Sequence, residues 1–260
     1  MRTTLSDIVS GLRQWRLWSL LALEDFKATY KRTLIGPLWV AASFAAFVGV
    51  KIFIFGSLNQ LGGGEYFSGY VTLGFMMWTY LANAVNSGVN AFTSSRNWIL
   101  GVSMPYSVFI FQKIALSLLN LAFVVVAAAL ILTMFMSISA KAYLLALSGI
   151  AVTVISLFWV QLLLAVLGVF FRDIIQLVST IMRIMFFLTP IIWMPAAIGA
   201  RANFVQWNPF THYLAIVRAP ILDGELPLIS LYIVFGIGGL AAILAIFAFG
   251  FARKYIPSYI

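Results

Sequence analysis

Six apolar runs, each about long enough to cross a bilayer, recur between residues 37 and 252. A helix needs roughly 20 predominantly apolar residues to cross the hydrocarbon. The runs cover residues 37–58, 67–90, 108–136, 142–169, 176–193 and 229–252. Only 9% of the 260 residues are charged, whereas a soluble domain carries about 25%. The sequence therefore predicts an all-α integral membrane protein with six transmembrane helices.

The segment before the first run predicts a helix on the membrane surface. Within residues 1–36, apolar side chains such as Leu12, Trp15 and Phe26 recur at helical spacing, and basic residues lie between them. Such a helix places its basic side chains among lipid headgroups. We expect an N-terminal amphipathic interface helix over residues 1–36 and a six-span domain over residues 37–260. The chain has no internal repeat or linker, which predicts one transmembrane domain over residues 1–260.

Basic residues predict the orientation in the membrane. Six spans place both ends of the chain on one side, and the side richer in Lys and Arg is cytoplasmic. The connections on the other side carry Lys141, Arg201 and Arg218. More basic residues lie in the two terminal segments and in the connections on the same side of the membrane: Arg2, Arg13, Arg16, Lys27, Lys31, Arg32, Arg96, Arg172, Arg253 and Lys254. Both termini are therefore expected in the cytoplasm, and residues 194–228 outside or dipping back as short gate helices.

The net charge of +9 raises the question of a nucleic-acid partner. The basic residues gather beside apolar runs, so membrane lipid is the expected partner and nucleic acid is not.

The second run also carries Asn83, Asn86, Ser87 and Asn90. Small and polar residues in a span favour helix–helix packing over lipid contact.

Catalytic and metal-binding patterns are missing from the sequence. It has no Walker GxxxxGK[ST], HExxH or GxSxG pattern. The lack of cysteine and the single histidine, His212, argue against a metal site. Asp223 and Glu225 could form a carboxylate pair, but such residues are more often solvated loop residues. We expect no catalytic residue, no metal and no cofactor in this chain.

The charged residues inside the runs, Lys51, Lys113 and Arg183, are all basic. Proton- or sodium-coupled transporters usually keep ionisable groups near the midplane. No acid falls mid-span here, which argues against cation coupling. Energy for transport would then come from a separate chain that hydrolyses ATP.

Four short motifs carry a family resemblance. Residues 25–39 read DFKATYKRTLIGPLW, residues 171–174 FRDI, residues 189–193 TPIIW, and residues 208–209 NP. In this order and placement they resemble motifs of the type-2 ABC permeases that export polysaccharides. The resemblance implies a homodimeric pore with two nucleotide-binding ATPase subunits that bind ATP and Mg. It also implies export of a lipid-linked glycan across the bacterial inner membrane.

The substrate class has several alternatives. The junction at Pro37 and the motif at Pro190 look closest to the O-antigen export permeases. Capsular polysaccharide and teichoic acid remain alternatives within the family. A small-molecule exporter of the same architecture is another reading, and a membrane-embedded lipid-modifying enzyme is the alternative from a different class.

The resemblance also nominates site residues. The interface-helix residues are Lys27, Tyr30, Lys31 and Arg32. The ATPase-coupling residues are Arg96, Asn97, Trp98, Arg172 and Asp173. The aromatic and basic channel lining is Trp39, Phe44, Phe47, Lys51, Arg183, Phe186, Phe187 and Trp193.

Each nomination has a plainer interpretation. Phe side chains often face lipid or pack helices, Trp favours the interface, and Lys51 and Arg183 could snorkel. The 91–107 loop could serve topology alone, and Arg172 with Asp173 could be a local ion pair that ends a helix.

Overall fold

The computed structural model describes residues 2–55 and 63–260, and every regular element in these ranges is a helix. The end of the first run and the residues that follow it, 56–62, lie outside the described residues. Residues 63–66, which come before the predicted start of the second run, already belong to a helix. The helices that match the six runs are α3 (Leu38–Phe55), α4 (Gly63–Val89), α6 (Ser107–Phe135), α7 (Ala140–Phe170), α8 (Asp173–Leu188) and α10 (Leu228–Ala252). The others are α1 (Arg2–Arg13), α2 (Trp15–Tyr30), η1 (Thr93–Ser95), α5 (Arg96–Gly101), η2 (Pro195–Trp207), α9 (Pro209–Leu222) and α11 (Ile256–Tyr259).

Four of the described helices are long and apolar enough to cross a membrane: α3, α6, α7 and α10. The chain is therefore an all-helical, multi-pass membrane protein. The other two predicted spans are weaker. Helix α8 has 16 residues, or about 24 Å, whereas the hydrocarbon core is about 30 Å thick. Helix α4 has 27 residues but carries polar side chains. The count of six spans stays a prediction.

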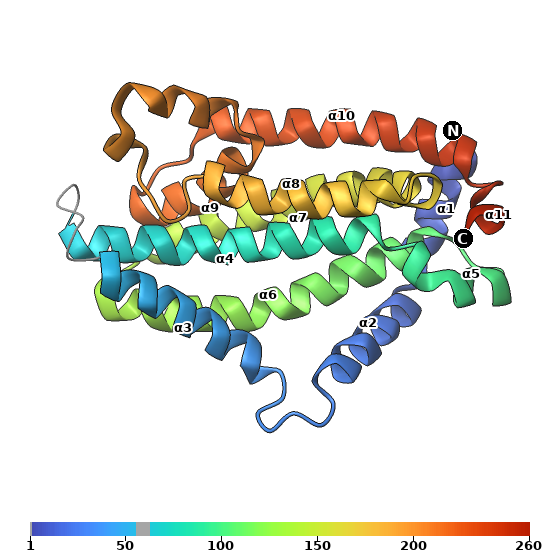
Figure 1. Cartoon of the computed structure of the whole chain (residues 1–260), viewed down its shortest axis with the longest axis horizontal. Coiled ribbons are helices and arrows are strands. Elements are labelled where there is room, and N and C mark those ends of the chain that lie inside the picture. The colour runs from blue at the N-terminus through green and yellow to red at the C-terminus, as the bar shows by residue number, and fades with distance from the viewer. Residues whose placement is uncertain (1, 56–62) are drawn as a thin grey trace.

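The long helices α4, α6, α7, α8 and α10 run along the long axis of the molecule (Figure 1). Helices α1, α5 and α11 gather at one end, while η2 and the α6–α7 connection lie at the other. The main core lies where α4, α7 and α9 meet, around Leu73, Met77 and Leu214. Gly149 of α7 allows this packing because a Cβ there would meet the carbonyl of Ile216 on α9.

The N-terminal segment forms two helices instead of the single helix predicted. The chain turns at Gln14, between α1 and α2. A long-range contact explains why α1 follows its own direction. The carboxylate of Asp7 accepts hydrogen bonds from the backbone N–H of Tyr106, at 3.3 Å, and of Ser107, at 3.0 Å. It also pairs with Arg253 at 2.9 Å, so α1 is tied to the start of α6 and the end of α10.

Helix α2 packs along α6 through apolar and polar contacts. Phe26 is buried and lies 5.7 Å from the ring of Phe123. Asp25 accepts a hydrogen bond from the side chain of Gln112 at 2.8 Å and pairs with Lys113 at 3.5 Å. Lys113, predicted as an intramembrane charge from the sequence, therefore has an acidic partner on α2.

The predicted short helices between the fifth and sixth spans are present as η2 and α9. Helix α9 begins with Pro209, which suits the first turn of a helix, and Asn208 caps it by accepting from the N–H of Phe210 at 3.0 Å. His212, Tyr213 and the other buried residues of α9 pack against α4, α7 and α10. This helix lies inside the bundle, as a re-entrant segment would.

Candidate translocation wall and coupling surface

Helix α8 carries a polar face that the rest of the chain leaves uncovered. Gln176, Thr180, Arg183 and Phe187 are exposed, and their spacing places them on one side of the helix. Arg183 donates to the hydroxyl of Thr180 at 3.3 Å. The only fully buried side chain of α8 is Met182. Amide, hydroxyl and guanidinium groups are costly to expose to hydrocarbon, so this face requires water or a partner.

Aromatic side chains connect α8 to α3 through α4. Phe44 and Phe47 of α3 stack on Phe75 of α4, with ring centroids 5.8 and 4.0 Å apart. The ring of Phe186 on α8 lies 6.4 Å from that of Phe75 and 5.8 Å from that of Trp78, both on α4. Phe187 lies 5.3 Å from Phe186, so four predicted channel residues belong to one cluster. Its centre, Phe75 and Trp78, was missed by the sequence reasoning.

A groove of about 370 Å³ runs between α4 and α8. Arg183, Phe186 and Phe187 line its α8 side, whereas Trp78 and Asn86 are on the α4 side. The groove therefore combines flat aromatic surfaces, one cation and polar groups. Such a lining suits sugar rings, which present both apolar C–H faces and hydroxyl groups.

The remaining predicted channel residues lie outside this groove. Lys51 has its ammonium 5.3 Å from the ring centroid of Phe47 and 5.5 Å from that of Phe55. Trp39 is half exposed at the start of α3. Trp193 donates its indole N–H to the carbonyl of Phe187 at 3.0 Å. It therefore stabilises the end of α8.

Two of the sequence motifs meet at the end of α8. Pro190 cannot continue a helix, and α8 ends at Leu188. The buried hydroxyl of Thr189 accepts from the amide of Asn208 at 2.9 Å. The guanidinium of Arg218 donates to the carbonyl of Pro190 at 3.0 Å. The TPIIW and NP motifs are therefore parts of one hydrogen-bonded unit.

The sequence predicted that Arg218 lies in an outer connection, but the structure places it elsewhere. It is buried within α9, with its guanidinium carbon 3.7 Å from the ring centroid of Tyr70. Gly74 leaves room for it, since a Cβ there would overlap the guanidinium. Without Arg218, the outer connections carry even fewer basic residues, so the predicted orientation is unchanged.

The nominated coupling residues are exposed at the end of the bundle that holds the termini. Arg96, Asn97 and Trp98 are exposed on α5. Arg172 and Asp173 are exposed at the α7–α8 turn. That turn follows Phe170, whose ring lies 4.8 Å from that of Tyr259 in α11. The structure thus places both groups at one end of the bundle (Figure 1).

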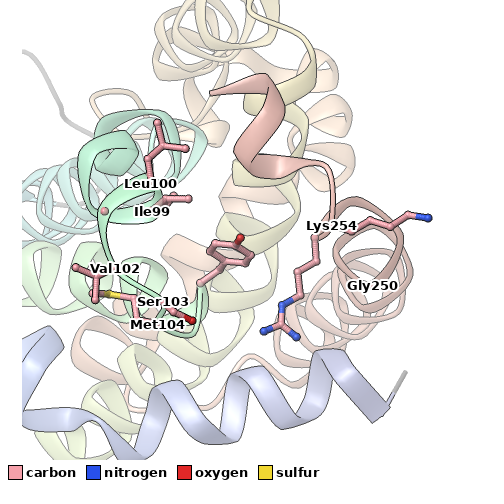
Figure 2. Close-up of a pocket in the computed structure, with 10 residues that line it drawn as sticks. Ile99, Leu100, Val102, Ser103, Met104, Gly250 and Lys254 are labelled. Carbon is pink, nitrogen blue, oxygen red and sulfur yellow. The ribbon is translucent and has the colours of Figure 1, made fainter.

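A groove of about 580 Å³ lies between α5 and the end of α10. Figure 2 shows Leu100, Val102 and Met104 on one wall and Lys254 across from them. Leu100 is 51% exposed and Val102 49%. Burial raises the pKa of the Tyr106 phenol at the base of the groove, although Arg253 lowers it, so the phenol is neutral at physiological pH.

The nominated interface-helix residues are mostly exposed. Lys27 pairs with Glu24 at 3.5 Å. Tyr30 donates to the side-chain oxygen of Asn120 on α6 at 3.1 Å. Lys31 and Arg32 are exposed after the end of α2. Tyr30 therefore joins α2 to α6, while the exposed Lys31 and Arg32 are placed where lipid headgroups could reach them.

No family model matches the chain. Three curated relatives do, each named "O-antigen export system permease protein RfbA". Two come from Klebsiella pneumoniae, both 23% identical over 205 residues, which are 78% of this chain and 79% of the relative. The third, from Myxococcus xanthus, is 24% identical over 227 residues, or 85% of this chain and 86% of the relative. The alignments span most of both chains and agree with the motif resemblance, so the chain is similar over most of its length to permeases of O-antigen export systems.

Proposed function

We propose that the chain is the membrane permease subunit of an ATP-driven exporter of lipid-linked polysaccharide, with O antigen as the first candidate substrate. The names of the three relatives support this substrate class. The observation that carries the proposal is the exposed face of α8, where Gln176, Thr180 and Arg183 continue into Phe186 and Phe187. A permease needs such a surface inside the membrane, and lipid is a poor partner for it.

The composition of this face fits the passage of a long glycan. A polymer must slide past its channel, so each contact has to be weak and repeated, because tight binding at one place would stall it. Aromatic rings supply such contacts to C–H faces of any sugar. Arg183 adds a positive charge for the phosphate that links glycan to lipid.

Two copies of the chain would enclose the path. In the single chain the face of α8 is open, and a homodimer would cover it with the same surface of a second copy. With six spans, this assembly places both termini on the cytoplasmic side of the bacterial inner membrane. The positive-inside bias supports that orientation.

The ATPase partners would dock at the terminal end. Trp98, Leu100 and Phe171 are 48%, 51% and 60% exposed there, beside the basic Arg96 and Arg172. Apolar side chains gathered among charges mark a protein interaction site. The partner chains would bind ATP and Mg, and this chain would contribute no catalytic residue.

A deletion strain tests the proposal. Fractionation and gel analysis should find finished lipid-linked polymer trapped on the cytoplasmic face, and the intact chain should restore surface glycan. The sugars of the trapped polymer would distinguish O antigen from capsule and teichoic acid. Normal surface glycan in a strain without a second exporter would refute the proposal. A changed lipid structure without trapped polymer would favour the lipid-modifying enzyme.

A further inference from the structure

Helix α4 presents a row of asparagines on the side that its core packing leaves free. Asn83 is exposed, and Asn86 and Asn90 are half-buried. Their spacing of three and four residues places them on one side of the helix. The packed side of α4 uses Leu81 and Gly88 instead. Leu81 and Gly88 therefore make the packing of α4 within the described chain, and the helix–helix contact predicted for the asparagines stays a prediction.

The hydrogen bonds of these amides show which atom each offers. The side-chain nitrogen of Asn86 donates to the carbonyl of Ala82 at 2.8 Å. That of Asn90 donates to the carbonyl of Asn86 at 2.9 Å. A backbone carbonyl only accepts, so the amide nitrogens must face the helix. The side-chain oxygens remain available as acceptors, and Asn83 adds a third amide in the same row.

The row continues the wall already described on α8. Asn86 lines the same groove as Ser179 and Arg183, and Trp78 lies about two turns before Asn86 on α4. Asn83 and Asn90 are seven residues apart, or about 10 Å along the helix axis. The asparagines then lead from the α5 end towards the aromatic cluster, with the small side chain of Ala82 between Asn86 and Trp78.

We propose that Asn83, Asn86 and Asn90 form a second wall of the translocation path and accept hydrogen bonds from the sugar hydroxyls of the glycan. The inference rests on the proposed function and adds its contact chemistry. A glycan chain is rich in hydroxyl donors, and the row offers acceptors at repeated spacing. Arg183 across the groove is a donor to anionic groups, so the two helices serve different parts of one substrate.

The native chain contains no cysteine, which makes site-directed labelling direct. Single variants Asn83→Cys, Asn86→Cys and Asn90→Cys are assembled with the ATPase in proteoliposomes and treated with a charged maleimide. Leu240→Cys, on an exposed apolar side of α10, and the buried Ala84→Cys serve as controls. The asparagine positions should react at least about tenfold faster than either control, because thiolate and charged reagent meet only in water.

The second measurement asks what occupies the path. The glycolipid fraction from the deletion strain should slow labelling at the three positions, whereas the same fraction after mild-acid removal of the glycan should not. Labelling equal to that of Leu240→Cys would overturn the inference. So would oxidative cross-linking between copies at these positions without labelling, which would make the row a protomer contact.

Glycan export by variants of Asn86, expressed in the deletion strain, provides an independent check. Asn86→Leu should lower surface glycan by about fivefold, which corresponds to one lost hydrogen bond, and Asn86→Ser should restore most of it. Equal export by both variants would refute the hydrogen-bonding role. The deletion strain remains the separate test of the function, since it traps polymer whether or not the asparagines touch it.

Discussion

Replacing the buried Asp7 should destabilise the end of the molecule that holds the termini. Its carboxylate is fully buried and bonds to two N–H groups at the start of α6, while the hydroxyl of Ser107 donates to the Asp7 carbonyl at 2.8 Å. Asp7→Asn preserves the shape but removes the charge and turns one acceptor into a donor that faces an N–H group. Arg253 would lose its partner.

The magnitude follows from burial. Breaking a buried ion pair by removing one partner costs about 3–5 kcal/mol. The Arg253 side chain is 37% exposed, and water will solvate part of its charge, so we take the lower end, about 3 kcal/mol. For a chain of this size each kcal/mol lowers Tm by about 2–4 °C, so the expected decrease is about 6–12 °C.

Thermal unfolding in detergent, followed by the fluorescence of the eight tryptophans, measures this decrease. Glu24→Gln is the matched control, since Glu24 pairs with Lys27 in an exposed position where an ion pair contributes about 0–1 kcal/mol. A Tm of Asp7→Asn that equals the control would refute the reasoning. In a double-mutant cycle, Arg253→Gln should cost less in the Asp7→Asn background than alone.

Three further outcomes follow from the packing, and thermal unfolding in detergent checks the first two. Asn208→Ala removes the cap of α9 and the bond to Thr189, which should cost about 2 kcal/mol, and Asn208→Asp should retain the cap and lose only the bond. Gly149→Val should cost at least about 1–3 kcal/mol because its side chain would enter the carbonyl of Ile216; an unchanged Tm would mean that α7 and α9 are further apart. Hydrogen exchange should be faster in α8, which buries only Met182, than in α7, and equal protection would contradict this order.

The spans were largely predictable because their signal is local. The run predicted at 108–136 is α6 (Ser107–Phe135), and the run at 142–169 is α7 (Ala140–Phe170). The length and apolar character of a segment determine such a helix, and lipid supplies the rest of its environment. The break at Gln14 was not predictable, because α1 takes its direction from Asp7, whose partners lie about a hundred residues away.

The partners of the intramembrane cations were hidden for the same reason. Lys113 and Arg218 appear in the sequence as isolated charges beside apolar residues. Their partners, Asp25 and the carbonyl of Pro190, are brought near only by the packing of α2 on α6 and of α9 at the end of α8. A backbone carbonyl that will accept such a bond cannot be recognised in the sequence.

The α4 wall had a readable signal that the sequence reasoning did not use. Phe75, Trp78, Asn83, Asn86 and Asn90 recur at spacings of three to five residues. One helical side that is aromatic and then amide-rich is poorly suited to lipid, because amide groups are costly to expose to hydrocarbon. That combination points to an aqueous path.

The two ends of the bundle and the wall between them are held in different ways. Asp7 and Arg253 join three helices at one end, and Arg218 and Asn208 fix the end of α8 at the other. Between these networks α8 buries only Met182. The packing therefore predicts firmly held ends and a more mobile α8 between them. The proposed glycan path would need both properties, because a tightly packed wall would admit one shape and a uniformly loose bundle would leak.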